Sequence, residues 1–300
     1  MNCIEQVIGE NYALYHGDCV EVLKGIPDQS IGYSIFSPPF ASLYTYSNSP
    51  RDMGNCRSNE EFFEHFGYLV DELLRVMKPG HNVSFHCMLF PASKERDGFI
   101  GLKDFRGDLI RAFQAKGFIF ASEVVIWKDP VTAMQRTKAL GLLWKQIKKD
   151  SCMSRQGVPD YVIVMRKPGE NEIDDRVSHT ADEFPVALWQ KYASPVWMDI
   201  NPSNTLQKLA KDENDERHIC PLQLDVIARC VKLWSNQGDI VLSPFAGIGS
   251  EGYQSLIMGR RFVGVELKSS YYEQAAKNLR KADTKNEQLS LFSKERAVNA

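Results

Sequence analysis

Apolar and polar positions follow two different periods along this chain, and the two alternate from one end to the other. Short apolar runs rich in β-branched and aromatic residues predict strands, whereas longer segments with apolar residues at helical spacing predict helices between them. The strands are predicted at 31–37, 81–87, 117–127, 160–166, 239–243 and 261–266, and the helices at 58–78, 104–116, 221–234, 250–258 and 270–282. Such alternation predicts the α/β class, with a doubly wound, mostly parallel, Rossmann-like sheet.

The clearest predicted helix lies in the stretch SNEEFFEHFGYLVDELLRVMKPG. Ser58 and Glu61 have the spacing of a capping box, and apolar residues recur from Phe62 onward. Pro79-Gly80 ends the pattern, because proline cannot continue a helix and glycine is common just after one. Farther along, Pro221 is predicted to open the helix that runs to residue 234.

Two segments break the alternation and divide the chain. Periodicity fades at 168–217, which predicts a small irregular lobe, and the polar segment 283–300 predicts a flexible tail. The two halves of one α/β domain are then expected at 1–167 and 218–282.

Composition narrows the class of protein. With 300 residues, 43% of them hydrophobic, the chain can bury a large core, and a net charge of −2 restricts any nucleic-acid surface to a local patch. Seven scattered cysteines without a CxxC pair predict a reduced, cytoplasmic protein with neither a disulfide framework nor a metal site. No signal peptide or membrane-spanning apolar run is expected.

A glycine-rich turn follows the predicted strand at 239–243. Gly247-Ile248-Gly249-Ser250-Glu251-Gly252 matches G-x-G-x-x-G between a strand and a helix, and Glu266 ends the next strand. Glycines let the backbone approach a ligand, and an acidic side chain at that place can bind ribose hydroxyls. The pattern predicts a nucleoside cofactor. NAD is one alternative, although little chain remains for a second dinucleotide-binding half, and a plain βα turn is another.

The stretch Ser37-Pro38-Pro39-Phe40 ends another predicted strand. Neither proline can donate to a sheet and each fixes φ, so the strand must stop and the chain must leave in a stiff turn. A strand-ending Pro-Pro turn without chemistry is the alternative interpretation.

Taken together, these motifs resemble those of the amino-group DNA methyltransferases, which modify adenine N6 or cytosine N4. Their catalytic motif reads Asp/Asn/Ser-Pro-Pro-Tyr/Phe, and SPFAGIG matches their cofactor motif except that Ser243 stands where Asp is usual. Ile248 and Ser250 also depart from it. The catalytic motif comes first here, which resembles the permuted β class and its phage and prophage members.

The resemblance implies S-adenosylmethionine as cofactor and a double-stranded DNA substrate. Ser37 Oγ and the Pro38 carbonyl would accept both hydrogens of the amino group, Pro39 would stiffen the turn, and Phe40 would stack on a base flipped out of the duplex. The residues implied for the cofactor are Asp18, Phe245, Gly247, Gly249, Glu266, His218 and Pro221.

Serine at the first motif position favours cytosine N4 over adenine N6 by a small margin. Two other activities stay open at this point: methylation of an RNA base or a protein glutamine, and DNA binding without turnover. No nuclease is visible in the sequence, so a restriction enzyme working beside this one would be another chain.

The densest basic segment lies ahead of the irregular lobe. DNA-phosphate contacts are predicted for Arg136, Lys138, Lys145, Lys148, Lys149 and Arg155. Lys145, Lys148 and Lys149 share one face of a helix, so a solvated helix face is the alternative. The lobe at 168–217 stands where a target-recognition domain would be expected.

The predicted tail contains a second motif, Gln288-Leu289-Ser290-Leu291-Phe292. It resembles the peptide that docks on the bacterial sliding clamp, with Gln288, Leu289, Leu291 and Phe292 as the contacting residues. An apolar patch that folds back on the enzyme is the alternative. A monomer or homodimer in a bacterial cytoplasm, encoded by host or phage, is the remaining expectation.

Overall fold

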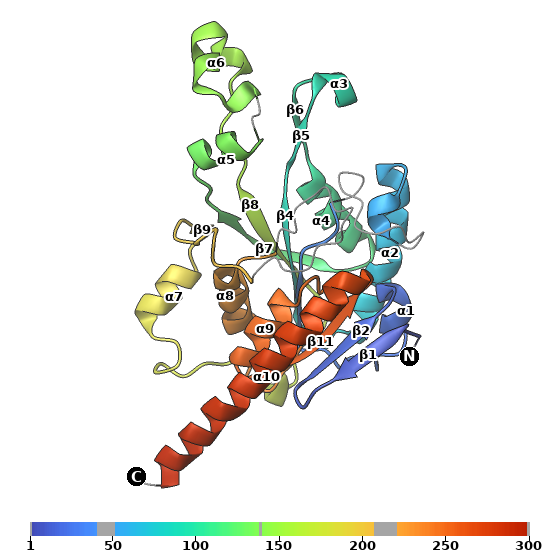
Figure 1. Cartoon of the computed structure of the whole chain (residues 1–300), viewed down its shortest axis with the longest axis vertical. Helices are drawn as coiled ribbons and strands as arrows, with labels where there is room; N and C mark the ends of the chain where they lie inside the picture. Colours follow the sequence, from blue (N-terminus) through green and yellow to red (C-terminus); the bar gives the residue numbers. More distant parts are fainter. Residues whose placement is uncertain (1, 41–51, 138–139, 207–220, 299–300) are drawn as a thin grey trace.

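The structure is a computed structural model that describes the chain except residues 1, 41–51, 138–139, 207–220 and 299–300 (Figure 1). Nine of its strands form one sheet in the order β1-β2-β11-β10-β3-β4-β8-β7-β9. They are β1 (Glu5–Ile8), β2 (Tyr12–His16), β3 (Tyr33–Phe36), β4 (Asn82–Met88), β7 (Ile119–Ile126), β8 (Asp160–Arg166), β9 (Val196–Trp197), β10 (Ile240–Ser243) and β11 (Arg261–Glu266). A separate hairpin pairs β5 (Phe90–Ala92) with β6 (Gly101–Lys103).

The helices alternate with these strands along the chain. They are α1 (Cys19–Leu23), α2 (Asn59–Val76), α3 (Lys94–Asp97), α4 (Phe105–Ala115), α5 (Pro130–Thr137), α6 (Trp144–Lys149), α7 (Val186–Tyr192), α8 (Leu224–Trp234), α9 (Ser250–Ile257) and α10 (Ser269–Val298).

The centre of the sheet is parallel, and its flanks are mixed. Strands β2, β11, β10, β3 and β4 are all parallel neighbours. Strand β8 is antiparallel to both β4 and β7, and β1 is antiparallel to β2 at one edge. The doubly wound, mostly parallel sheet predicted from the sequence is therefore confirmed.

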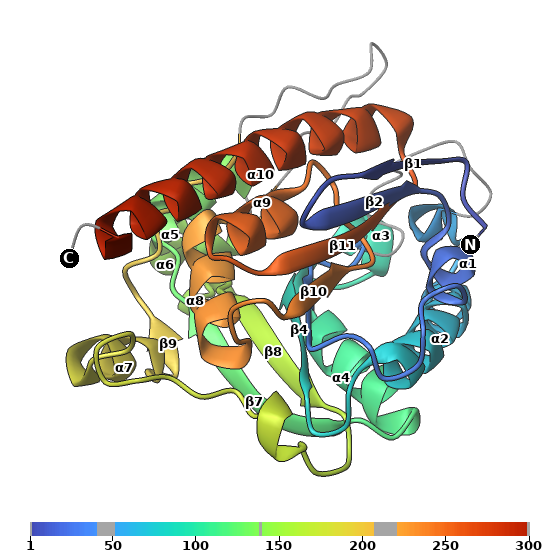
Figure 2. The same ribbon diagram turned by 90° about the horizontal axis from the view of Figure 1, so that it is seen from below.

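Helices cover both faces of the sheet, as Figure 2 shows from below. Side chains of α1, α2 and α4 pack with Phe36 and Phe85 on one face, whereas α8, α9 and α10 pack with Tyr33 and Ile35 on the other. Neighbouring residues of β3 thus point to opposite faces, and all four side chains are fully buried. The continuous apolar run around residue 35 reads as a strand buried on both faces for this reason.

The first long helix begins where the sequence predicts. Ser58 Oγ accepts a hydrogen bond from the Glu61 backbone N–H at 3.2 Å, which is the first half of the capping box. The Glu61 carboxylate returns one residue earlier than expected, to the Arg57 N–H at 2.7 Å. Both bonds satisfy backbone donors around the first turn.

The irregular lobe is less separate than the sequence predicts. Its strand β9 pairs parallel with β7 at the edge of the main sheet, with Val125 opposite Val196. Trp197 is almost fully buried in the core beside α8, and the Arg229 guanidinium lies 5.1 Å from its ring centroid. Trp189, by contrast, is half-exposed. The lobe therefore shares a core with the large sheet because its one buried tryptophan packs there.

Two helix ends differ from the prediction. Helix α8 begins at Leu224 with Gln223 as its N-cap, three residues after Pro221. Helix α10 continues from Ser269 to Val298 instead of ending near residue 282, so the clamp-like segment 288–292 has a helical backbone. Residues 283–298 contain neither glycine nor proline, and several strong helix formers such as Lys, Glu, Gln and Leu explain the continuation. Clamp docking stays a prediction.

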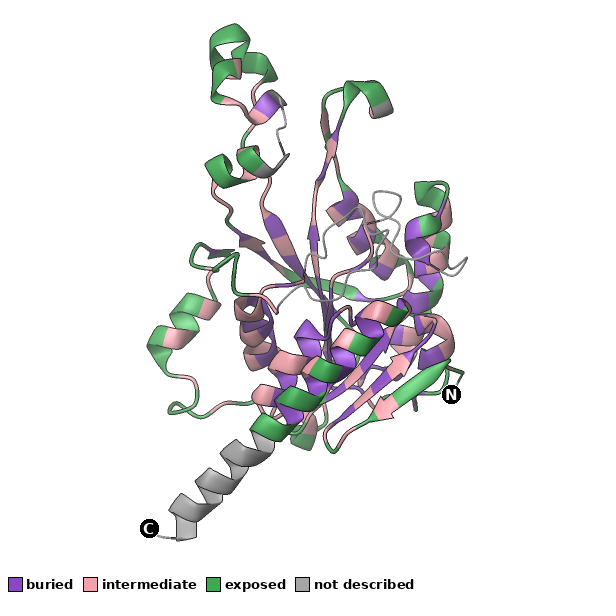
Figure 3. Cartoon of the chain, in the orientation of Figure 1, coloured by how far each residue is buried: buried purple, intermediate pink, exposed green. Residues whose placement is uncertain are grey.

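Two arms rise from the same edge of the sheet in Figure 1: the β5–α3–β6 hairpin, which follows β4, and α5 with α6, which follow β7. Strand β7 runs in the same direction as β4, because β8 is antiparallel to both. Figure 3 shows that α6 is mostly exposed, whereas the sheet beneath is mostly buried. Within the described residues, no helix has the length and apolar character needed to cross a membrane.

Close packing at Gly252 gives a test of this fold. A Cβ atom there would lie 2.4 Å from Leu279 Cδ2 and 2.5 Å from the ring of Phe262. Gly252→Ala should lower the free energy of unfolding by about 1–3 kcal/mol, because α9 must move off the sheet. Urea unfolding followed by circular dichroism measures this. The matched control is Gly157→Ala, where the nearest atoms are 3.7 Å away. Equal stability of both variants would contradict the packing.

Candidate active site

The predicted site residues meet at the carboxyl edge of the parallel strands. Ser37 follows β3, the glycine turn follows β10, Glu266 ends β11, and Asp18 comes two residues after β2. From β10 the chain passes through α9 to β11 on one side, and from β3 it passes through α2 to β4 on the other. The crevice between two such diverging connections is where open α/β sheets bind ligands.

The glycine turn has a backbone that other residues would not adopt easily. Gly247 has φ +53° and Gly249 has φ +84°, and Gly249 is the N-cap of α9. A Cβ atom on Gly247 would meet nothing within 4 Å, whereas one on Gly249 would lie 3.3 Å from Ala275. Gly247 therefore leaves space open beside the backbone, and Gly249 lets α9 approach α10.

Glu266 ties this turn to the end of β11. Its two carboxylate oxygens accept hydrogen bonds from the Gly247 N–H at 2.7 Å and the Lys268 N–H at 2.8 Å. Burial raises the pKa of Glu266 to about 7, although these backbone N–H groups act in the opposite direction. Each oxygen keeps further acceptor capacity, so the carboxylate can fix the loop and still accept from a ligand's hydroxyls.

Two serine hydroxyls beside the turn are buried without a partner. Ser243 Oγ and Ser250 Oγ have no hydrogen-bond partner among the described residues. Ser243 ends β10, where the resembling family usually has Asp, and Ser250 begins α9. Unpaired buried polar atoms are costly. Together with the space at Gly247 and the Glu266 carboxylate, they fit a site for a polar nucleoside cofactor.

The other predicted cofactor residues have distinct surroundings. The ring of Phe245 is partly exposed and lies 5.7 Å from that of Phe36. Asp18 is the N-cap of α1, and its Oδ1 accepts from the Glu21 N–H at 3.0 Å. Pro221 is partly buried just ahead of α8, and His218 lies outside the described residues.

The Ser-Pro-Pro-Phe turn leaves β3 at the same edge. Pro38 is buried, whereas Ser37, Pro39 and Phe40 are partly exposed. The Phe40 ring packs edge-on against Phe90 of β5, with the centroids 5.9 Å apart. The sheet and the hairpin arm thus both contact the turn, while Ser37 itself stays partly exposed.

Sequence reasoning missed a chain of polar groups behind Ser37. Ser37 Oγ lies 3.3 Å from His86 Nδ1, and His86 Nε2 lies 3.0 Å from Asp160 Oδ2. Lys128 Nζ lies 2.6 Å from the other Asp160 oxygen. Burial raises the pKa of the Asp160 carboxyl, but His86 and Lys128 outweigh it and hold that pKa below its ordinary value.

The sequence contained a signal for these polar groups. His86 interrupts the apolar run of β4, and Asp160 begins the apolar run of β8. A polar residue in or next to a buried strand needs a partner. The partnership itself depends on β8 running antiparallel to β4, which spacing does not reveal.

The basic segment lies on one of the two arms. Lys145, Lys148 and Lys149 are exposed on α6, and none of them forms an ion pair with another described residue. Arg155 is partly buried, and its backbone N–H donates to the Gly141 carbonyl at 2.7 Å. Arg136 belongs to α5, but its side chain is not described, and Lys138 lies outside the described residues. The structure thus brings the three lysines together.

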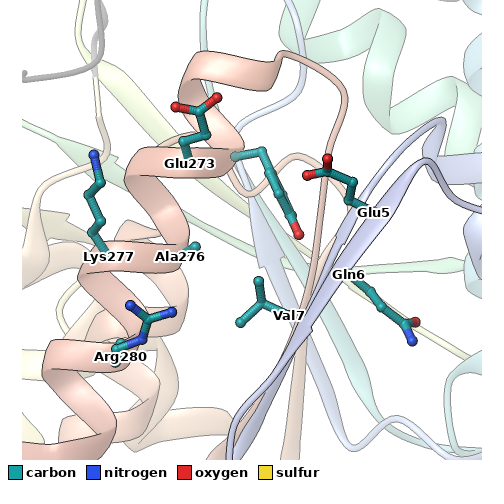
Figure 4. A pocket seen from close by; sticks show the side chains of 8 residues that line it. Glu5, Gln6, Val7, Glu273, Ala276, Lys277 and Arg280 are labelled. Atoms are coloured by element: carbon teal, nitrogen blue, oxygen red, sulfur yellow. The ribbon is translucent and has the colours of Figure 1, made fainter.

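A hollow of about 480 Å³ lies elsewhere, between β1 and the first half of α10 (Figure 4). Charged side chains such as Glu5, Glu273, Lys277 and Arg280 surround it, and it includes none of the predicted site residues. The candidate site is therefore identified by its chemistry and its place in the sheet. Among the described residues, no group of His, Cys, Asp and Glu has the arrangement of a metal site.

Comparisons with known proteins show which family this chain is similar to. The family model for DNA methylases matches residues 33–277. The type II methyltransferase M.BamHI from Bacillus amyloliquefaciens is 25% identical over 85% of this chain, which spans 54% of that protein's length. The DNA adenine methyltransferase YhdJ from Escherichia coli K12 is 24% identical over 90% of this chain and 83% of its own.

One solved structure shows the same fold. The DNA modification methylase TTHA0409 from Thermus thermophilus, complexed with S-adenosyl-L-methionine, superposes with a TM-score of 0.66. It is 20% identical, and the match covers 90% of this chain and 95% of that one. Because the family model spans most of its length, from β3 through the first part of the last helix, this chain belongs to the N6/N4 DNA methylase family.

Proposed function

We propose that this protein transfers the methyl group of S-adenosylmethionine to an exocyclic amino group of a base in DNA. The observation that carries the proposal is the meeting of two motifs at one edge of the sheet. Ser37 follows β3, and the glycine turn follows β10, which pairs with β3. Glu266, at the end of the neighbouring strand β11, bonds to the glycine turn.

The cofactor site is proposed at the glycine turn. The Glu266 carboxylate would accept from the ribose hydroxyls, and the space beside Gly247 would let the ligand approach the backbone. Bound there, S-adenosylmethionine supplies a methyl group activated by a positively charged sulfur. The Ser243 and Ser250 hydroxyls would find partners on the ligand or its bound water.

The amino group of a base is a poor nucleophile because its lone pair is delocalised into the ring. Ser37 Oγ and the Pro38 carbonyl would accept its two N–H bonds and so turn the lone pair towards the methyl group. The two prolines fix the direction of that carbonyl before the substrate arrives, which is electrostatic preorganisation. Holding the nucleophile and methyl group in line supplies further rate.

The base would have to leave the duplex, because its amino group cannot reach this edge from within the stack. Phe40 would stack on the flipped base. Serine at the first position of the Ser-Pro-Pro-Phe motif resembles the enzymes that act on cytosine N4, so cytosine N4 is the favoured target. Adenine N6 is the alternative, because the similar protein YhdJ is named as an adenine methyltransferase.

The arm formed by α5 and α6, which we call the basic arm, would hold the duplex. Lys145, Lys148 and Lys149 are exposed without a described acidic partner, and α6 follows β7, whose carboxyl end lies at the edge where Ser37 emerges. Phosphate contacts of this kind position DNA without reading its sequence. The lobe at 168–217 is proposed to supply target recognition.

The first test is mass spectrometry of nucleosides from unmethylated DNA incubated with methyl-labelled S-adenosylmethionine. Labelled N4-methylcytosine is the expected product, and Ser37→Ala should slow its formation about a hundredfold because one preorganised acceptor is lost. Ser122→Ala, on the exposed part of β7, is the matched control. Labelled N6-methyladenine would change the base but keep the reaction, whereas label in RNA or protein alone would overturn the proposal.

A second test uses the pKa of about 7 at Glu266. The ionised carboxylate accepts hydrogen bonds more strongly than the protonated carboxyl group does. Because the ionised fraction grows about tenfold between pH 6 and 8, the affinity for S-adenosylmethionine should rise about tenfold over that range. Isothermal titration calorimetry measures it. Glu266→Gln should bind more weakly and lose this rise, and the ligand's own titration affects both proteins equally. Glu251, whose pKa burial raises to about 8, is the neighbouring control: Glu251→Gln should keep the rise. An unchanged profile in Glu266→Gln would count against the assignment.

A third test concerns the basic arm. Replacing Lys145, Lys148 and Lys149 together by Ala should weaken DNA binding and reduce the slope of log K against log salt by about 2–3, one unit for each lost phosphate contact. Fluorescence anisotropy at several salt concentrations measures both. The matched control replaces three lysines along α10, Lys277, Lys281 and Lys285. An equal slope change in both triple variants would show that α6 has no special role.

A further inference from the structure

His86 stands at the centre of the polar chain behind Ser37, and the proposed function gives it no task. We infer that His86 is a positioning residue for Ser37 that also accepts, through the Ser37 hydroxyl, the proton that the methylated amino group must lose. This inference rests on the proposed function, because it concerns the same amino group.

The strand register places the three groups in a line. In the parallel pair β3–β4, Phe36 lies opposite Phe85, so the residues that follow, Ser37 and His86, are neighbours. In the antiparallel pair β4–β8, Met88 lies opposite Asp160 at the same edge. The result is Ser37 Oγ at 3.3 Å from His86 Nδ1, and His86 Nε2 at 3.0 Å from Asp160 Oδ2.

The contacts of the ring determine where its proton sits. The Asp160 oxygen 3.0 Å from Nε2 lacks the alignment of a hydrogen bond, but its negative charge repels a lone pair there and so favours the neutral tautomer with the proton on Nε2. Nδ1 is then the free acceptor, and it receives the Ser37 hydroxyl hydrogen. With its own hydrogen directed at His86, Ser37 Oγ presents its lone pairs to a substrate N–H.

The surroundings favour a charge on the ring after the reaction. The Asp160 side chain is only 4% exposed, and Lys128 pairs with its other oxygen, so the carboxylate stays ionised and fixed in place. The described charged groups around His86 are thus Asp160 from β8 directly, and Lys128, after β7, through Asp160. An imidazolium formed there would face a carboxylate held without rearrangement.

The methylated amino group must lose one proton. When the amino nitrogen gains a methyl group, it carries one proton more than the neutral product and a positive charge. That N–H bond breaks with its electrons left on nitrogen, its proton goes to Ser37 Oγ, and the Ser37 hydroxyl proton goes to His86 Nδ1. The serine ends as it began, and one proton has moved to the histidine, which later releases it to water.

A proton acceptor and a merely structural histidine can be told apart with His86→Asn. The asparagine oxygen can take the place of Nδ1 as acceptor from Ser37, but it cannot hold a proton. The experiment measures the single-turnover rate of methyl transfer to unmethylated DNA from pH 5.5 to 9, at saturating S-adenosylmethionine. Asp160→Asn is the second variant, and His81→Asn, one residue before β4, is the matched control.

We expect the wild-type rate to fall at acidic pH, as it does when a reaction needs a free general base. His86→Asn should be about a hundredfold slower, within the usual range for a lost acid–base group, and should lose that acidic decline. Asp160→Asn should also be slower, whereas His81→Asn should keep both rate and profile. The affinity for S-adenosylmethionine should change less than twofold in every variant.

Two results would overturn the inference. An active wild type with a His86→Asn rate within threefold at every pH would remove the proton-accepting role and leave the proposed function intact. A rate loss in both His86→Asn and Asp160→Asn that keeps the acidic decline, or that follows a loss of folding and cofactor binding, would make the role structural. A wild type that binds S-adenosylmethionine but methylates no DNA base would overturn the proposed function and this inference together.

Discussion

The parallel pairing of β3 with β10 is the constraint on which the rest of the site depends. It joins residues 208 positions apart in the chain, and at the Ser34–Leu242 pair the serine hydroxyl adds its own hydrogen bond of 3.0 Å to the Leu242 carbonyl. Ser34 is fully buried, so that bond has no competition from water. Two residues beyond the pair, β3 ends in the Ser-Pro-Pro-Phe turn, and β10 ends just before the glycine turn. If this register slipped by one residue, the side chains of the slipped strand would point to the opposite face of the sheet.

Glu266 extends the same constraint to a third strand. Its carboxylate bonds to the Gly247 backbone, so the glycine turn is held both by β10, from which it emerges, and by β11 beside it. Burial that raises its pKa to about 7 shows that the protein holds this carboxylate at a cost near neutral pH. A carboxyl group retained at such a cost, with acceptor capacity left over, is typical of a group kept for a ligand.

Much of this arrangement could be predicted from the sequence because its signals are local. The Pro-Pro step must end a strand, the glycines need positive φ, and the helix at 59–76 carries its own cap at Ser58. The features that could not be predicted are those set by pairing. Strand β9 is two residues long and has no periodicity of its own, so the burial of Trp197 in the main core is visible only once β9 pairs with β7. The link between Ser37 and Asp160 likewise requires two strand registers at once.

The order of the motifs along the chain matters less to the chemistry than the order of the strands in space. The glycine turn comes late in the sequence, yet β10 lies between β11 and β3, so the glycine turn and the Ser-Pro-Pro-Phe turn are neighbours whichever comes first. What the fold must supply is a strand pair whose connections diverge, with rigid turns at both carboxyl ends. In the turn after β10, glycines allow positive φ, and in the turn after β3, prolines fix φ. Beyond them, β4 and β8 add the His86–Asp160 pair, whose position depends on the antiparallel flank of the sheet and not on either motif. In the proposed reaction, the parallel centre would place the two reactants, and the antiparallel flank would supply the inferred route by which the proton leaves.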